Sequence, residues 1–440
     1  MLQPPQAMVA RMLAMMLVVV GWGFWACGCE GGGPAEGSGG TSSASPARVT
    51  LRVMHDPIGR SGVLDRTLAA EYEAATGVRV DFTGESISSS DMLVRTFQIL
   101  GARSSSVDLF YIDVIWPPML AEHFVDLRPA MARDLSAFSP VVMEAVTVGG
   151  KVVAAPLFSD VGLLYYRADL FAKYGIDTPP ATWDELETVA RRIQDAERAA
   201  GNPDFWGYGF AGKAGESLTC EALEWIASHG SPEGFLHEGA PVFSNESSLE
   251  ALRRAAAWPR NIAPPDTADL DIRNVHTMFE QGNLAMMRNW TWARIPLQMP
   301  GSPMAGRVGI ARMPGGDGGQ FSTLGGWNLA VSRYSENPDE AIAFARWFTS
   351  APVLARRFEE GGFPPPRPDA WPLVEPGPHL EVLEVSIRQA VLRPSRIARE
   401  RYNEVSSVIF SQLNAMLRGE LEPDAAARNI DDQLRDLLRR

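Results

Sequence analysis

Residues 151–175 read KVVAAPLFSDVGLLYYRADLFAKYG, and the rest of the chain can be arranged around this stretch. The apolar run VVAA predicts a buried strand that breaks at Pro156. A second apolar run follows Asp160 and leads into a predicted helix. We interpret the stretch as a crossing between two lobes, where Asp160 and the nearby Phe158 would face a ligand cleft. A solvated turn carboxylate between two core strands is the alternative interpretation of Asp160.

The length and charge of the chain limit the classes of protein to which it can belong. Its 440 residues exceed what one hydrophobic core normally serves, so at least two lobes are expected. The net charge of −13 and the lack of any lysine- or arginine-rich run argue against binding to nucleic acid or to anionic lipid surfaces. A small neutral or polar ligand is the expected partner.

The N-terminal segment has the pattern of a targeting signal. Arg11 is followed by the apolar run 12–20 and then by GWGFWACGC, which gives a basic region, an apolar region and a small-residue end. This end resembles a lipoprotein processing box, in which the new N-terminal cysteine is lipidated. The prediction is a signal peptide over 1–28 and lipidation of Cys29, with Cys27 as the alternative. An ordinary secretory signal or an uncleaved anchor also remains open, and each of these places the body outside the cytoplasm.

The segment after the signal predicts a tether. Residues 29–47 are rich in Gly, Ser, Thr, Ala and Pro, a composition that buries little and is typical of flexible linkers. A lipidated Cys29 would then hold the body at the cell membrane, on the periplasmic side in a Gram-negative cell. Cys220 is the one cysteine beyond this segment, so no disulfide is expected within the body.

The first part of the body predicts a mostly parallel sheet. Apolar or alternating runs at 49–55, 78–82 and 107–112 indicate strands, and segments with helical spacing lie between them. This β-α-β-α-β order is typical of a parallel sheet covered by helices. Asp113 directly follows the third strand, at the edge where such sheets bind ligands. It could also cap the turn that follows, and the two roles are compatible.

A tryptophan next to a polar residue recurs where a predicted strand ends. Trp116 follows the strand that ends near Asp113, Trp290 follows a strand over 284–288, and Trp327 begins the strand-like run that returns the chain. A flat indole can pack against the apolar C–H face of a sugar ring, while carboxylates and amides bind its hydroxyls. Packing in the core is the commoner role of any single tryptophan.

Patterns for cofactor chemistry are missing from the sequence. No Gly-x-Gly-x-x-Gly opens a helix, no phosphate-loop pattern is present, and histidine and cysteine do not cluster at metal-binding spacing. We therefore expect neither a cofactor nor a metal.

Several motifs, in one order along the chain, resemble a known family. The chain is similar to the extracellular sugar-binding lipoproteins of ABC importers, in their maltose/trehalose branch. The motifs that carry the resemblance are VDLFYIDVIWPPMLAEHFVDL (107–127), PLFSDVGLLYYRADLFAKYG (156–175), PPATWDEL (179–186), NPDFWGY (202–208), MFEQGNLAMMRNW (278–290), TLGGWNLAVSRYSEN (323–337) and AVLRP (390–394).

This resemblance implies an α/β, two-lobe periplasmic-binding-protein fold with a hinge and a ligand cleft between the lobes. The first lobe would comprise 48–156 and 306–362, and the second 157–305 and 363–440. The implied function is a monomeric receptor that captures a di- or oligosaccharide, such as trehalose or maltose, and delivers it to the membrane permease of an ABC transporter, without catalysis.

The resemblance also implies a set of ligand-binding residues. They are Asp113, Asp160, Trp290, Gly326, Trp327 and Arg393, to which we add Trp116 and Phe158. Phe158 stands where close relatives have tyrosine, which removes one hydroxyl group from the expected site. Relatives that hold trehalose or maltose carry an acid at the start of the first helix, whereas this chain reads Gly-Arg-Ser-Gly at 59–62. Met92 occupies a position on the second helix where those relatives carry arginine. These departures leave the particular sugar open.

Two other functions compete with the sugar receptor. Asp113 and Asp160 could be the paired carboxylates of a glycoside hydrolase. A receptor for another polar solute, such as a polyamine or an amino-sugar, is also compatible with an aromatic pocket that contains few acids.

Overall fold

The computed structural model describes residues 49–84 and 88–439. The predicted signal peptide (1–28), the tether (29–47), and the candidate lipidation residues Cys27 and Cys29 lie outside these described residues. Within the described part, no helix combines the length and the apolar character needed to cross a membrane.

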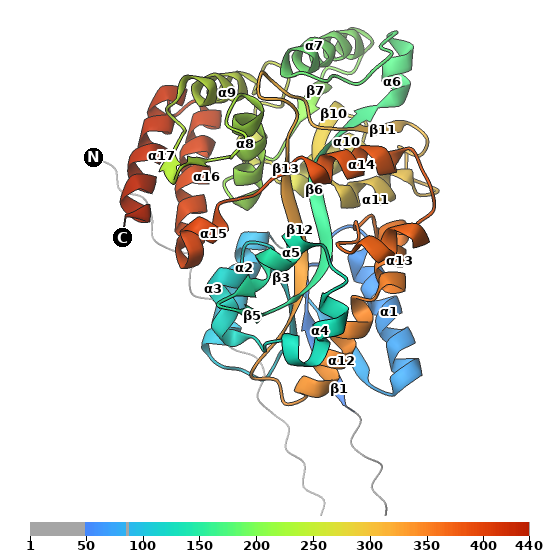
Figure 1. The fold of residues 1–440 in the computed structure, drawn as a ribbon. Helices are drawn as coiled ribbons and strands as arrows, with labels where there is room; N and C mark the ends of the chain where they lie inside the picture. Colours follow the sequence, from blue (N-terminus) through green and yellow to red (C-terminus); the bar gives the residue numbers. More distant parts are fainter. Residues whose placement is uncertain (1–48, 85–87, 440) are drawn as a thin grey trace, which may run out of the picture. The chain divides into compact units, whose positions relative to one another are not determined.

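One sheet of nine strands organises the body (Figure 1). Its order is β2-β1-β3-β12-β6-β10-β7, with β11 paired to β6 and β13 paired to β12. Strands β1, β2 and β3 pair in parallel, which confirms the predicted β-α-β-α-β start. The strands are β1 (Thr50–Met54), β2 (Arg79–Thr83), β3 (Leu109–Asp113), β6 (Ala155–Arg167), β7 (Trp206–Gly209), β10 (Leu284–Trp290), β11 (Val308–Ala311), β12 (Ser322–Val331) and β13 (Ala390–Val391).

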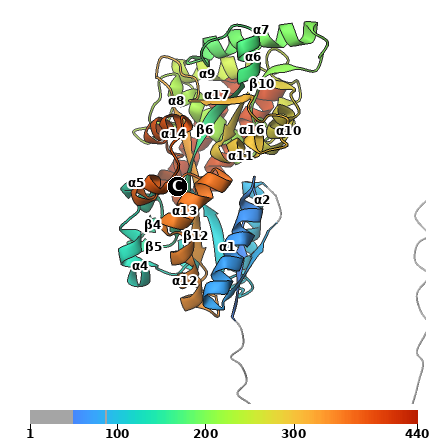
Figure 2. The same cartoon turned by 90° about the vertical axis from the view of Figure 1, so that its right-hand side faces the viewer.

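The sheet has two parts, one with β1–β3 and one with β7 and β10, and Figures 1 and 2 show one part above the other. Helices cover both parts. Around β1–β3 lie α1 (Ser61–Thr76), α2 (Ser89–Gly101), α3 (Pro117–Leu120), α4 (Arg128–Leu135), α5 (Pro140–Ala145), α12 (Pro338–Phe348) and α13 (Ala351–Gly361). The other part carries α6 (Ala168–Lys173), α7 (Trp183–Ala199), α8 (Glu216–Ser228), α9 (Glu246–Ala257), α10 (Ile272–Glu280), α11 (Arg294–Gln298), α14 (His379–Arg388), α15 (Ser395–Ala398), α16 (Tyr402–Arg418) and α17 (Pro423–Leu438). Two small hairpins complete the described body: β4 (Thr147–Val148) with β5 (Lys151–Val152), and β8 (Leu236–His237) with β9 (Ala240–Pro241).

Strand β6 joins the two parts of the sheet. Its first half pairs antiparallel with β12, and its second half pairs with β10 and β11. The predicted break at Pro156 is wrong, because this residue lies inside β6. Pro156 lies opposite Asn328, where the β6–β12 register shifts, and such an irregularity tolerates a residue without an N–H group.

Strand β12 begins earlier than the sequence predicts. It starts at Ser322 rather than at Trp327, so Trp327 lies inside a strand and not at a strand end. The intervening Gly325 and Gly326 have low strand propensity, and their pairing with Asp160 and Ser159 of β6 overrides it. Strand β10 extends as far as Trp290, which is its last residue.

The close approach of β12 to β6 requires glycine at position 326. Gly326 has φ of 133°, and a Cβ atom built on it would lie 2.3 Å from the carbonyl oxygen of Phe158. An L-residue would therefore be strained in its backbone and would also press against β6.

We expect Gly326→Ala to lower the free energy of unfolding by about 2 kcal/mol or more, since the strained φ alone costs about 1–3 kcal/mol. The measurement is urea denaturation of the ligand-free body. Gly101→Ala is the matched control, because a Cβ at Gly101 meets no atom within 4 Å and alanine suits the end of α2. Equal stability of the two variants would contradict the proposed strain.

Candidate functional site

A pocket of about 470 Å³ lies where the two parts of the sheet meet. This volume falls in the usual range for small-molecule sites. The carboxyl ends of β3 and β10, the middle of β6 and β12, and the N-terminal ends of α2, α8 and α10 contribute to its wall. Seven of the eight residues predicted for a ligand site line it: Asp113, Phe158, Asp160, Trp290, Gly326, Trp327 and Arg393.

Asp160 presents one carboxylate oxygen to the pocket and uses the other within the protein. Its Oδ1 accepts hydrogen bonds from the Thr291 hydroxyl (2.6 Å), the Thr291 amide (3.0 Å) and the Val161 amide (2.9 Å). Its Oδ2 accepts no hydrogen bond from the described residues. The side chain is only 6% exposed, and this burial raises the pKa of Asp160 to about 6, against the opposing effect of the Thr291 bonds.

Asp113 is held by an ion pair with Arg393. Its Oδ1 accepts hydrogen bonds from Arg393 Nη2 (2.8 Å) and from the Ile115 amide (3.2 Å), so Asp113 both closes its turn and lines the pocket. Burial raises the pKa of Asp113, and the positive charge of Arg393 opposes this rise. Its Oδ2 has no hydrogen-bond donor among the described residues and is available to a ligand.

Arg393 also binds Glu216, at the start of α8 in the second part of the body. Its Nη1 donates to Glu216 Oε1 at 2.8 Å, and Glu216 further accepts hydrogen bonds from Tyr402 and Ser406 at 2.6 Å each. Arg393 thus connects the end of β3 to the start of α8. Each terminal nitrogen of the guanidinium thus binds one carboxylate, while Nε is buried without a hydrogen-bond partner among the described residues. Arg393 therefore serves the site mainly by fixing Asp113.

The aromatic residues of the predicted site occupy different positions. Trp290 and Trp327 are half-buried and line the pocket, whereas Trp116 does not line it. Trp116 is 2% exposed and meets Trp327 edge-on, with ring centroids 5.3 Å apart. Phe158 lines the pocket and packs against Phe363, with ring centroids 4.8 Å apart.

Several lining residues were not predicted from the sequence. Arg273, in the first turn of α10, donates to both carboxylate oxygens of Asp56 at 3.0 Å and joins the two sides of the pocket. Glu216 and the segment 88–91 also contribute to the wall. The partners in these ion pairs lie 177 to 280 residues apart, so no local pattern indicates them. Among the described residues, no group of three or more His, Cys, Asp or Glu is placed to hold a metal ion.

Both the sequence and the fold of this chain match known proteins. The sequence pattern of the bacterial extracellular solute-binding proteins matches residues 62–355. A probable ABC transporter-binding protein of Deinococcus radiodurans is 36% identical over 399 residues, which cover 89% of this chain and 95% of the relative. The chain belongs to the bacterial extracellular solute-binding protein family. As a member, this solute-binding protein is a receptor of an ABC transporter and acts outside the cytoplasm.

Solved structures confirm the fold of the solute-binding protein. Maltose-bound MalE3 of T. maritima has a TM-score of 0.83 and 29% identity, and the match covers 88% of this chain and all of MalE3. The two-lobe periplasmic-binding-protein fold predicted from the sequence is thereby confirmed. The mannitol-binding protein of Pseudomonas aeruginosa is 28% identical over 220 residues, about half of each chain.

The burial of Asp160 gives a pH dependence that can be measured without a ligand. The pKa of Asp160 is raised from 3.8 to about 6 in the folded state. Between these two values the folded state binds a proton that the unfolded state has lost, so stability falls as the pH rises from about 4 to about 6 and then levels. The shift corresponds to about 3 kcal/mol at most.

We expect this contribution to be absent from Asp160→Asn, whose amide oxygen can still accept the Thr291 bonds. The measurement is the free energy of unfolding of both proteins from pH 4 to pH 8. The difference between the two curves should change across pH 4–6 by about 1–3 kcal/mol. Parallel curves would show that Asp160 does not titrate in this range.

Proposed function

We propose that this solute-binding protein captures a di- or oligosaccharide of the maltose or trehalose kind and delivers it to its permease as a monomeric receptor. The observation that carries the proposal is the meeting of two indoles and two carboxylates in one pocket. Trp290 and Trp327 offer aromatic faces, and Asp113 and Asp160 each offer a free Oδ2. A sugar needs both kinds of surface, because its C–H face is apolar and its hydroxyls are donors.

The fixed partners of the carboxylates favour recognition of hydroxyl groups. Charged acceptors give hydrogen bonds about twice as strong as neutral ones, provided that their orientation is set in advance. Thr291 fixes the carboxylate plane of Asp160, and Arg393 fixes that of Asp113. The maltose in the related MalE3 supports this ligand class.

We propose further that neither carboxylate transfers a proton to or from the sugar. Asp113 is ion-paired with Arg393, which favours its ionised form. Asp160 has the raised pKa that a general acid would also need. Prolonged incubation with maltotriose therefore distinguishes the two functions: a receptor leaves the sugar intact, and reducing ends that depend on Asp160 would indicate a hydrolase.

Ligand capture in this proposal closes two lobes over the pocket. We keep the lobes predicted from the sequence, 48–156 with 306–362 and 157–305 with 363–440, with one amendment. Strand β11 would move with the second lobe, because it pairs with residues 164–167 of β6. Strands β6 and β12 would then carry the hinge.

The first test is calorimetric titration of the body with mono-, di- and oligosaccharides. We expect a disaccharide or longer sugar to bind and to raise the melting temperature by mass action. Trp290→Ala should weaken the binding free energy by about 1–3 kcal/mol through lost stacking and burial.

The matched control for this variant is Trp206→Ala. Trp206 is also half-buried and lies under an arginine, with Arg198 Cζ 4.1 Å from its ring centroid, but it is outside the pocket. The control should bind sugar like the parent protein. Equal losses of affinity in the two variants, or no binding of any sugar by the parent, would contradict the proposal.

We also propose that Cys29 anchors the mature protein through a lipid. The support is the sequence that precedes it, an apolar segment that ends in Ala-Cys-Gly-Cys. Cys29→Ser should abolish incorporation of radiolabelled fatty acid and release the protein from membranes. Cys27→Ser is the control and should stay lipidated; label retained in Cys29→Ser but lost in Cys27→Ser would move the anchor to Cys27.

A further inference from the structure

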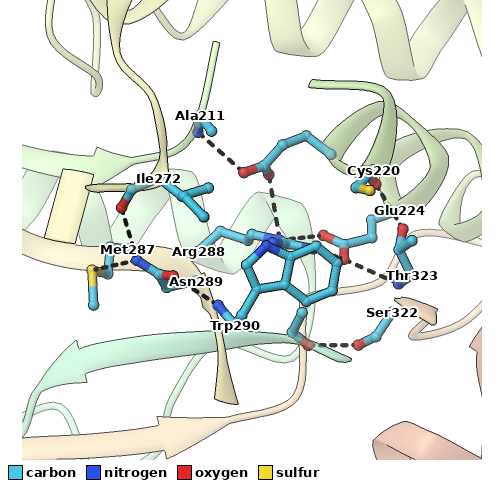
Figure 3. Close-up of polar contacts among 12 residues, drawn as sticks. Ala211, Cys220, Glu224, Ile272, Met287, Arg288, Asn289, Trp290, Ser322 and Thr323 are labelled. Carbon is cyan, nitrogen blue, oxygen red and sulfur yellow. Dashed lines mark hydrogen bonds and ion pairs between the residues drawn. The ribbon is translucent and has the colours of Figure 1, made fainter. Parts of the chain in front are cut away.

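A buried ion pair lies directly beneath one of the indoles of the pocket (Figure 3). Arg288 and Trp290 are two residues apart in β10, so their side chains leave the same face of the strand. Arg288 Cζ lies 4.0 Å from the centroid of the Trp290 ring. Its guanidinium group therefore covers one face of the indole. Because the Arg288 side chain is fully buried, water does not reach the guanidinium group.

Glu224 of α8 fixes the position of this guanidinium. Its two carboxylate oxygens accept from Arg288 Nη2 (2.6 Å) and Nε (3.1 Å), and Oε1 also accepts from the Thr323 amide (3.0 Å). The bidentate geometry leaves Arg288 little freedom to rotate. Glu221 lies farther away, with Oε2 3.8 Å from Arg288 Nε, and burial raises its pKa to about 8.

Two glycines leave room for this arrangement. A Cβ atom on Gly162 would lie 2.1 Å from Glu224 Oε1 and 2.6 Å from Arg288 Nη2. A Cβ atom on Gly325 would lie 2.8 Å from Cζ3 of Trp290. The indole is thus confined by a charged group at one face and by the backbone of β12 at its six-membered ring.

We propose that Arg288, held by Glu224, is a positioning residue that fixes the orientation of the Trp290 indole for the ligand. This inference rests on the proposed function of Trp290 as a sugar-stacking surface. A confined indole loses little conformational freedom when a ligand stacks on it, so its contact energy appears as affinity. Arg288 lies beneath the indole and is not among the residues that line the pocket, so its contact with the ligand runs through Trp290. Its positive charge also opposes the rise in the pKa of Asp160.

The test removes the ion pair as a unit, because loss of one partner would leave an unpaired buried charge. The variant is Arg288→Met with Glu224→Gln, whose side-chain oxygen can still accept from the Thr323 amide. We expect it to bind maltose, or the tightest sugar of the titration panel, about 10- to 100-fold more weakly than the parent protein. Glu221→Gln is the matched control from the same cluster and should bind normally.

The deciding comparison repeats this titration in the Trp290→Ala background, with all titrations at pH 8, well above the pKa of about 6 for Asp160, so that the lost charge of Arg288 does not alter the ionisation of Asp160. If Arg288 acts through Trp290, the double substitution should change affinity less than about 2-fold there. An equal loss of affinity in both backgrounds would overturn the proposal, since a general structural defect does not depend on Trp290. Arg288→Lys keeps the charge but not the bidentate bonds, and it should give an intermediate loss in the same comparison if the double variant does not fold.

A second readout needs no ligand and separates this inference from the proposed function. The indole N–H resonance of Trp290 is identified by its loss in Trp290→Phe. We expect one sharp signal in the parent protein and a broadened or multiple signal in Arg288→Met with Glu224→Gln. A signal that stays single and sharp would overturn the positioning role, whereas a parent protein that binds no sugar would overturn the proposed function alone.

Discussion

The antiparallel pairing of β6 with β12 is the constraint on which the pocket depends. The register places Trp327 beside Asp113 of β3 on one side and beside Phe158 of β6 on the other. It also places Gly325 beside Asp160, so the pocket residues of three strands form adjacent rows. A shift by one residue would turn these side chains to the opposite face of the sheet. Gly326 permits the close contact that holds this register.

Those parts of the site that follow from local patterns could be predicted from the sequence. Asp113 ends an apolar strand in a β-α-β unit, and ligands of such units lie beyond the strand ends. Asp160 lies in an otherwise apolar crossing, and Trp290 closes a strand. The parallel start of the sheet could also be predicted, because the local spacing of apolar residues indicates alternating strands and helices.

Features that depend on tertiary neighbours could not be predicted in this way. Pro156 can lie inside a strand because an irregularity in the β6–β12 ladder accommodates this residue. The sequence around Pro156 contains no sign of that irregularity. Arg273 and Glu216 bind partners that lie 217 and 177 residues away in the sequence. Arg288 belongs to the pocket only through the ring that covers it, and no spacing rule distinguishes it from an ordinary strand residue.

The ion pair of Arg393 has a consequence for the order of folding. Its contacts span 280 residues to Asp113 and 177 residues to Glu216. Contacts between such distant residues form slowly, because a long loop must close before they contribute to stability. Strands β1–β3 with α1 and α2 can form from about the first quarter of the chain. A partly synthesised chain would therefore acquire much of its secondary structure well before it could retain a solute.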